Sequence, residues 1–314
     1  MSEGRVVGVD VGGTSTRALA VELDGTLVGR GRSGGGNPNS HPPELAAKRV
    51  AESVREALGD GGSARACLLG MAGESKFTDP EIVGLFEATL RQVGVTCRID
   101  VVSDTEVAFA SATAEPNGTI VLGGTGAAAA RIVDHRQERW VDGWGWLLGD
   151  EGSGYWIGRE AVRCALRTLQ AGEAPGPLAQ AVLTEALPTS SGLDKRTINR
   201  LITAVNAEPP IRLARFASMV STLAETDPLA GEIVARAAEH LAAHALTARD
   251  PGEQTPVVLA GSVIGPDSPV GRALRATLSA KISAPILFAP DCAVGAAWLA
   301  ALSVAGPDAP RPKV

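Results

Sequence analysis

The chain has 314 residues, enough for one large or two medium domains that each bury a core of their own. Its formal charge is −6, from 29 Lys and Arg residues against 35 Asp and Glu residues, which excludes wholesale binding to nucleic acid or to an anionic membrane. Aromatic residues make up only 4% of the chain and glycines number 37, and this composition favours a helix-rich α/β protein over a β-sandwich.

The first third of the chain alternates strands and helices around a glycine turn. An apolar strand runs into Gly12-Gly13, and Asp24-Gly25 is a two-residue hairpin signal between the next two strands. From residue 43 the apolar residues recur at helical spacing. In chain order we predict strands at 6–13, 16–23 and 26–32, a polar loop at 34–39, a helix at 43–58, a strand at 66–71, a helix at 79–93 and a strand at 98–102.

The same order begins again at Thr119. TIVLGGTG is a second apolar strand that enters a second glycine turn, and two further strands follow, which indicates a duplicated topology rather than a short-period repeat. We predict strands at 119–126, 128–133 and 139–141, helices at 193–205, 211–223 and 230–246, a third strand with a glycine turn at 256–265, a strand at 285–288 and a helix at 292–302. The tail GPDAPRPKV is expected to be frayed.

The glycine turns are predicted to bind phosphate. A strand that ends in Gly-Gly-Thr or Gly-Thr-Gly exposes successive N–H groups, and neighbouring hydroxyls add donors. One such turn often serves only a tight bend, but two matched turns and a third strand end favour a nucleotide clamp. Neither turn is a Walker loop or a dinucleotide fingerprint, because no Gly-Lys-Ser/Thr follows and each leads into a hairpin. The predicted phosphate ligands are Gly12, Gly13, Thr14, Ser15, Gly124, Thr125 and Gly126.

Asp10 lies in the first strand, just before the first glycine turn. A carboxylate beside bound phosphates is costly unless a cation neutralises the repulsion. Mg²⁺ suits this position, because it keeps several waters and needs only one or two protein carboxylates. The alternative is an Asp that caps its own turn. We predict Asp10 as the metal-binding residue.

Five segments, in order, carry a resemblance to a known family: GVDVGGTSTR, SDTEVAF, LGGTGAAAA, GWGWLLGDEGSGYWIG and LAGSVIG. Over nearly the whole chain they resemble the N-acetylglucosamine kinase and BadF-type ATPase family of the actin-like ATPase superfamily. The resemblance implies an α/β, duplicated ribonuclease-H-like fold with two domains around a central cleft and the last helix packed on the first domain. It also implies ATP with Mg²⁺, and a homodimer. We place the domains at 1–114 plus 292–314 and at 115–291.

The resemblance also assigns roles to individual residues. Asp104, which follows an apolar strand, matches the family's catalytic base, although its place before a predicted helix also suits an N-cap. Glu106 matches nothing in the motif and is the less favoured base. Glu151 suits either a sugar ligand or a surface turn, and Trp156 is expected in the core. The implied sugar site consists of Asn37, Asp104, Trp144, Gly145, Asp150 and Glu151, and the implied adenosine site of Gly261 and Ser262.

One departure from the family bears on the substrate. N-acetylglucosamine kinases follow the second glycine turn with Ser-Asn, which helps to hold the acetamido group, whereas this chain has Ala127-Ala128. Each lost partner costs about 1–3 kcal/mol. A cationic free amino group would instead favour a carboxylate-rich pocket. We therefore predict a kinase for the 6-hydroxyl of D-glucosamine, with N-acetylglucosamine or glucose as alternatives.

The remaining signals define the rival functions. A BadF-type ATPase that activates a dehydratase needs cysteines for an iron–sulfur cluster, but the four cysteines are scattered and Cys164 stands alone. A sugar-sensing regulator would need a DNA-binding segment. His240 and His244 have the spacing of a metal pair, but with no third ligand we expect them to pack or to be solvated. No secretion signal or membrane-spanning run is evident, so we expect a cytoplasmic protein without nucleic-acid or membrane partners.

Overall fold

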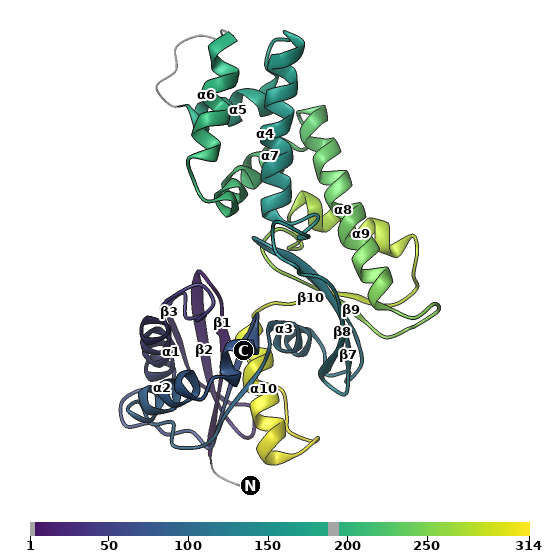
Figure 1. Ribbon diagram of the computed structural model, residues 1–314. Coiled ribbons are helices and arrows are strands. Elements are labelled where there is room, and N and C mark those ends of the chain that lie inside the picture. The colour runs from purple at the N-terminus through teal and green to yellow at the C-terminus, as the bar shows by residue number, and fades with distance from the viewer. Residues whose placement is uncertain (1–3, 188–194) are drawn as a thin grey trace. The chain divides into compact units, whose positions relative to one another are not determined.

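The computed structural model describes residues 4–187 and 195–314. Within these residues the chain forms two compact units, coloured along the chain in Figure 1. Unit 1 consists of the chain up to Gly118 with Ile132–Glu138 and Ala289–Val314, and unit 2 of Thr119–Arg131 and Arg139–Phe288. Among the described helices, none combines the length and the apolar character needed to cross a membrane.

Unit 1 is built on a sheet with the strand order β3-β2-β1-β4-β5. The first three strands are antiparallel neighbours, whereas β1, β4 and β5 run parallel. Its elements are β1 (Arg5–Val11), β2 (Ser15–Glu22), β3 (Leu27–Gly34), α1 (Pro43–Leu58), β4 (Ala66–Met71), the 3₁₀ turn η1 (Glu74–Thr78), α2 (Pro80–Arg91), β5 (Ile99–Ser103), α3 (Asp104–Ala112) and α10 (Cys292–Ala305).

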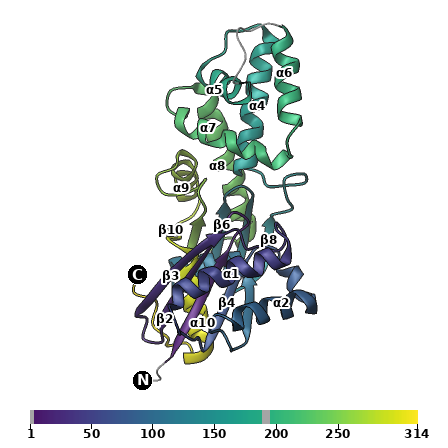
Figure 2. The ribbon, with the colours of Figure 1, turned by 90° about the vertical axis from the view of Figure 1, so that its left-hand side faces the viewer.

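The two faces of this sheet are covered by different helices, as Figures 1 and 2 show. Alternate residues of β1 separate the two cores: Val7 and Val9 pack with α1 and α2, and Val6 packs with α3 and α10. Helix α10 lies directly on β1 because Gly8 has no side chain, since a Cβ atom there would overlap the backbone nitrogen of Ala297. The C-terminal helix therefore belongs to the core of unit 1.

The tail after α10 is ordered, so the expectation that it frays is wrong. Lys313 N donates to Gly25 O at 2.8 Å, and the indole of Trp298 donates to Ala309 O at 3.0 Å. Ala309 is buried among the side chains of the α3–α10 core. The tail is held by contacts with residues that are distant in the chain. The expectation of fraying rested on the local composition of Gly, Pro and charged residues, which gives no information about such contacts.

Unit 2 is built on a sheet with the strand order β10-β9-β6-β7-β8. Strands β6, β9 and β10 run parallel. Its elements are β6 (Gly118–Gly123), β7 (Ala127–Val133), β8 (Arg136–Asp142), α4 (Gly154–Ala171), α5 (Pro177–Ala186), α6 (Lys195–Asn206), the 3₁₀ helix η2 (Pro210–Phe216), α7 (Ala217–Leu223), α8 (Pro228–Ala248), β9 (Val257–Ala260), α9 (Pro269–Ser279) and β10 (Ile286–Phe288).

The two sheets have the same topology. In each, the first strand is central, the next two strands follow it on one side, and two later strands follow it on the other side: β1, β2, β3, β4 and β5 correspond to β6, β7, β8, β9 and β10. This correspondence confirms the predicted duplication. The predicted domain division at 115 and 292 remains a proposal, and the compact units differ from it in assigning the hairpin tip Ile132–Glu138 to unit 1.

The helical part of unit 2 departs from the predicted elements at two places. The helix predicted at 211–223 is a 3₁₀ helix, η2, followed by the α-helix α7. The spacing of apolar residues does not distinguish a 3₁₀ helix, whose hydrogen bonds join residues three apart, from an α-helix, whose hydrogen bonds join residues four apart. The prediction therefore merged η2 and α7 into one helix. The helix predicted at 193–205 begins outside the described residues and corresponds to α6 from Lys195.

Candidate functional site

The first glycine turn, in unit 1, exposes unused backbone donors. Gly12 N donates to Ser15 O at 3.0 Å and closes the turn. The amides of Gly13 and Thr14 have no hydrogen-bond partner among the described residues, and both residues are exposed. Two successive open N–H groups of this kind are the donors that an anion-binding nest offers.

The polar loop at 34–41 contacts the carbonyl groups of this turn. Gly36 N and Asn37 N both donate to Gly12 O, at 3.1 and 3.3 Å, and the imidazole Nε2 of His41 lies 2.8 Å from Gly13 O. These contacts occupy the carbonyl groups of the turn. The opposite side of each peptide, with its N–H group, therefore stays free for a ligand.

The second glycine turn, in unit 2, has the same design. Gly124 N donates to Gly126 O at 2.9 Å, and the first turn of α4 is tied to the turn by Gly154 N to Gly124 O at 2.8 Å and Tyr155 N to Thr125 O at 3.1 Å. In the described part of the chain, the amides of Thr125 and Gly126 donate to nothing. The matched sequences at the two turns therefore produce matched geometry.

The predicted adenosine residues lie beside this second turn. Gly261 follows β9 with a φ of +111°, and Val263 N donates to Gly123 O at 3.0 Å. A Cβ atom at position 261 would overlap Gly123 O, so glycine is required for the two strand ends to meet. Gly261 and Ser262 are thereby brought to the same edge of the sheet as Gly124–Gly126.

Asp104 is the first residue of α3, in unit 1, and does not cap the helix. The N-cap is Ser103, whose hydroxyl accepts Thr105 N at 3.3 Å and leaves the Asp104 carboxylate free of that task. Burial, and to a smaller extent the nearby charge of Asp10, together raise the pKa of Asp104 from its ordinary value to about 6. Two carboxylates thus lie close enough to repel each other.

Glu106, two residues further on, is engaged in hydrogen bonds to the β7–β8 hairpin. Its buried carboxylate accepts Gln137 N at 2.9 Å and the guanidinium of Arg136 at 3.1 Å. These bonds fasten the tip of the β7–β8 hairpin to the start of α3. The geometry agrees with the preference for Asp104 over Glu106 as a base.

Asp10 is paired with an arginine that the sequence reasoning missed. Arg17 Nη2 lies 2.9 Å from Asp10 Oδ2, and Arg17 Nη1 lies 3.9 Å from Asp291 Oδ1 at the N-cap of α10. Burial raises the pKa of Asp10, and the charge of Arg17 lowers it. Asp10 and Arg17 face each other directly across the β1–β2 hairpin, so a pairing register for the two strands would have placed them together.

Asn37 is buried and already makes two hydrogen bonds. Its Oδ1 accepts Asn39 N at 2.8 Å, and its Nδ2 donates to Ala72 O at 3.0 Å. An amide side chain has two N–H groups and two lone pairs, so one donor and one acceptor site remain for a ligand. The fixed orientation suits a binding group.

Asp150 lies at the end of the loop 142–152 in unit 2. It is 7% exposed, its φ is +59°, and its Oδ1 accepts Ala127 N at 3.1 Å. Oδ2 has no hydrogen-bond partner within the described residues, and burial raises the pKa of this carboxyl. Asp150 thus has one oxygen that accepts a hydrogen bond and one that is open to a ligand. Both lie next to the second glycine turn, because a Cβ atom on Gly126 would lie 3.0 Å from each of them.

The other predicted sugar residues of this loop differ in their surroundings. Trp144 is 65% exposed and Gly145 has a positive φ of +83°, whereas the carboxylate of Glu151 lies 3.8 Å from both Arg159 and His240. Glu151 is therefore held by two basic side chains. Trp156 is buried in the core, as expected.

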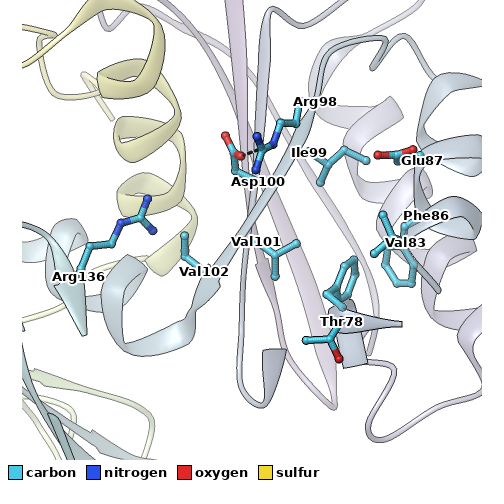
Figure 3. Close-up of a pocket in the computed structure, with 11 residues that line it drawn as sticks. Thr78, Val83, Phe86, Glu87, Arg98, Ile99, Asp100, Val101, Val102 and Arg136 are labelled. Atoms are coloured by element: carbon cyan, nitrogen blue, oxygen red, sulfur yellow. Dashed lines mark ion pairs between the residues drawn. The ribbon is translucent and has the colours of Figure 1, made fainter. Parts of the chain in front are cut away.

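A pocket of about 690 Å³ in unit 1 is lined by Arg136 and by residues of α2 and β5. Figure 3 shows Phe86 and Val83 of α2 on one side and the strand β5 on the other, with an ion pair of 3.2 Å between Arg98 and Asp100. None of the residues predicted for the nucleotide, metal or sugar lines it. The candidate site is therefore defined by the strand ends and not by this hollow.

The chain is similar in sequence to a known sugar kinase. An N-acetylmuramic acid/N-acetylglucosamine kinase of Clostridium acetobutylicum is 34% identical over 168 residues, which span 52% of this chain and 54% of that protein. The chain thus matches about half the length of that relative.

Two solved structures are similar over almost their whole length. A Chromobacterium violaceum protein provisionally described as an N-acetylglucosamine kinase is 26% identical, with a TM-score of 0.73 and coverage of 94% of this chain and 98% of that one. A ROK family glucokinase of Streptomyces griseus, solved with glucose and AMPPNP, is 20% identical, with a TM-score of 0.57 and coverage of 95% and 99%. The fold is therefore the duplicated ribonuclease-H-like fold of the actin-like ATPases.

The family model of the BadF/BadG/BcrA/BcrD ATPases matches residues 7–300. This span includes both glycine turns, Asp104, the loop 142–152 and Gly261. The chain belongs to the BadF/BadG/BcrA/BcrD ATPase family.

Proposed function

We propose that this protein is an ATP-dependent amino-sugar kinase that transfers the γ-phosphoryl group to the 6-hydroxyl of its substrate. N-acetylglucosamine is the better supported substrate, because the relatives from Clostridium and Chromobacterium carry that activity in their names. The observation that carries the kinase assignment is Asp104: a carboxylate free of any capping role, near Asp10 and in the unit that carries the first glycine turn. A cytoplasmic homodimer remains part of the proposal.

The proposed reaction uses this chain's residues in three roles. The open amides at the two glycine turns bind phosphate oxygens and orient ATP. The sugar 6-oxygen forms a bond to the γ-phosphorus as the bond from that phosphorus to the bridging oxygen of ADP breaks. Asp104 accepts the proton that leaves the 6-hydroxyl, which balances the charge on the attacking oxygen.

The residues near Asp104 fit a magnesium ion. The charge of Asp10 raises the pKa of Asp104, so a divalent cation held by Asp10 would relieve this repulsion. Among the described residues no group of three or more His, Cys, Asp or Glu side chains could hold a metal, and Mg²⁺ needs only one or two carboxylates beside phosphate and water. Asp10 would hold the ion, which supplies charge neutralisation at the β- and γ-phosphates when bound.

Replacing Asp10 with asparagine is expected to lower kcat/KM for MgATP by about 10–100-fold and to raise the Mg²⁺ concentration needed for half-maximal rate. Asparagine keeps the shape but removes the charge that attracts the cation. A magnesium titration of initial rates measures this. Asp24→Asn, in the exposed hairpin turn of the same sheet, is the control and should behave as the wild type; an unchanged titration in Asp10→Asn contradicts the role.

The rate of phosphoryl transfer is expected to rise with pH through about 6. Burial holds the pKa of Asp104 near that value, and only the ionised carboxylate accepts a proton, so activity is lost as pH falls below it. A profile of kcat/KM for the sugar between about pH 5 and about pH 8 measures this limb. A profile that stays flat down to pH 5 would contradict a base with this pKa.

Glucosamine is a second candidate substrate, favoured by the residues after the second glycine turn. Ala127 N already donates to Asp150 Oδ1, and the methyl group of Ala128 borders the loop, because a Cβ atom on Gly143 would lie 3.1 Å from it. Neither side chain can bind an acetamido group through a hydrogen bond. The Asp150 carboxylate, whose Oδ2 has no hydrogen-bond partner among the described residues, supplies negative charge that suits an ammonium group.

A coupled assay of ADP formation with N-acetylglucosamine, glucosamine and glucose tests the proposal. We expect sugar-dependent turnover with the highest kcat/KM for N-acetylglucosamine. A higher value for glucosamine would reverse the choice of substrate and keep the kinase. ATP hydrolysis that no sugar accelerates would overturn the kinase and favour the dehydratase-activator class of the family.

A further inference from the structure

The loop 142–152 has a strained backbone that needs local support. Asp142 and Asp150, at its two ends, have φ values of +61° and +59°, and neither is a glycine. A side chain in this left-handed region costs free energy, and such residues persist where the surroundings determine their conformation. Asp150 is also the residue proposed to bind the sugar, so what fixes its backbone bears on function.

The carboxylate of Asp142 joins the two ends of the loop. Its Oδ1 accepts Asp150 N at 2.9 Å and its Oδ2 accepts Glu151 N at 3.0 Å, and the residue is only 4% exposed. The fit is close, because a Cβ atom on Gly149 would overlap Asp142 Oδ1. Hydrogen bonds to a charged acceptor are stronger than those between neutral groups. Asp142 therefore sets the direction of the peptide that carries Asp150.

One face of helix α8 supports this loop. His244 Nε2 lies 3.5 Å from Asp142 Oδ2, and His240, one turn earlier, packs its ring on Trp156 and lies 3.8 Å from Glu151. Gly152 lies against the same helix. The two histidines thus pack against the loop, in agreement with the expectation of a packing pair.

The surroundings of His244 indicate which nitrogen carries its proton. Nδ1 is buried and has no hydrogen-bond partner among the described residues, so a proton there would be an unsatisfied donor. Nε2 faces the Asp142 carboxylate. Burial lowers the pKa of His244, which keeps the ring neutral, although the nearby charge of Asp142 acts in the other direction. His244 is therefore a neutral imidazole that presents its N–H to Asp142.

We propose that Asp142 and His244 are positioning residues that orient Asp150 for the sugar: His244 holds Asp142, and Asp142 holds the backbone amides of Asp150 and Glu151. This proposal rests on the proposed sugar kinase function. It predicts that the pair affects the sugar and leaves the nucleotide unaffected, because its contacts lie on the sugar loop.

Asp142→Gly tests the carboxylate without straining the backbone, since glycine readily adopts a φ of +61°. We expect kcat/KM for the sugar to fall by about 100-fold, which is the loss that a displaced binding group causes, with KM for ATP unchanged. Asp142→Asn keeps one acceptor and should give a smaller loss. The matched control is Asp134→Gly in the β7–β8 turn, another aspartate with positive φ, which should change neither constant.

Two variants separate the polar contact of His244 with Asp142 from the volume of its ring. His244→Gln keeps an N–H group within reach of Asp142 and should retain most of the sugar kcat/KM, whereas His244→Phe keeps the ring and should lose it. Equal losses in both variants, or equal losses for sugar and ATP in Asp142→Gly, would overturn the positioning role and leave a purely structural one.

Hydrogen–deuterium exchange keeps this test independent of turnover. The amides of Asp150 and Glu151 should exchange faster in Asp142→Gly than in the wild type, and in Asp134→Gly they should not. If the wild type phosphorylates no sugar, the kinase proposal fails while this exchange result still stands. Unchanged exchange in Asp142→Gly would overturn the clamp itself.

Discussion

Asp104→Asn is expected to lower kcat by about 10²–10⁴-fold, the usual contribution of a general base, while KM for ATP and for the sugar change little. Asparagine has the same shape, and the helix keeps its cap because Ser103 provides it. The variant should be at least as stable as the wild type at neutral pH. The pKa of Asp104 is raised from 3.8 to about 6, so the cost of ionising it in the folded protein develops as pH rises above 3.8 and is complete above about pH 6. Asparagine removes that cost.

This combination distinguishes a base from a structural residue. Replacing a side chain that serves folding lowers the stability of the protein, whereas replacing one that serves catalysis lowers turnover alone. Rapid-quench measurement of phosphoryl transfer and thermal unfolding give the two readouts. Asp100→Asn, in the strand β5 that precedes Asp104 and paired with Arg98, is the matched control and should keep full activity. Turnover within a few-fold of wild type in Asp104→Asn would contradict the mechanism.

Asp150→Asn is expected to lower kcat/KM for the sugar by about 10–150-fold with KM for ATP unchanged. Asparagine tolerates the positive φ and can still accept Ala127 N through its Oδ1. Its amide nitrogen replaces the open oxygen, so one charge-assisted bond to a sugar hydroxyl is lost, worth about 1.5–3 kcal/mol. Steady-state kinetics with varied sugar at saturating ATP measure the loss.

A second buried aspartate of unit 2 serves as the control for this variant. Asp227 caps α8 by accepting Leu229 N and also accepts Leu178 N at 2.8 Å. Asp227→Asn should lower the free energy of unfolding by about 1–2 kcal/mol and leave the sugar constants unchanged, because its bonds are purely structural. Similar sugar kinetics in Asp150→Asn and Asp227→Asn would show that Asp150 does not contact the substrate.

Local signals determined most of the fold. The helix predicted at 43–58 and the strand predicted at 66–71 coincide with α1 and β4, because apolar periodicity and turn residues act over a few positions. The two strand-to-glycine turns carried both the duplication and the open amides of the phosphate clamp. Asp104 came from the family resemblance, since spacing alone favoured an N-cap.

Only the tertiary structure decided how distant side chains meet. The sequence does not say that Arg17 pairs with both Asp10 and Asp291, or that the tail returns to Gly25. These contacts join residues that are close in space and distant in the chain, so they depend on how the elements pack, while propensities act locally.

The loop 142–152 separates the two kinds of information most clearly. The sequence by itself marked Asp150 as a sugar ligand through its motif and His240 and His244 as a pair on one helix face. The fold alone brought His244 to Asp142, and Asp142 to the amides of Asp150 and Glu151. Helical spacing determines which side chains share a face, whereas the surface that the face meets depends on the packing of the whole unit.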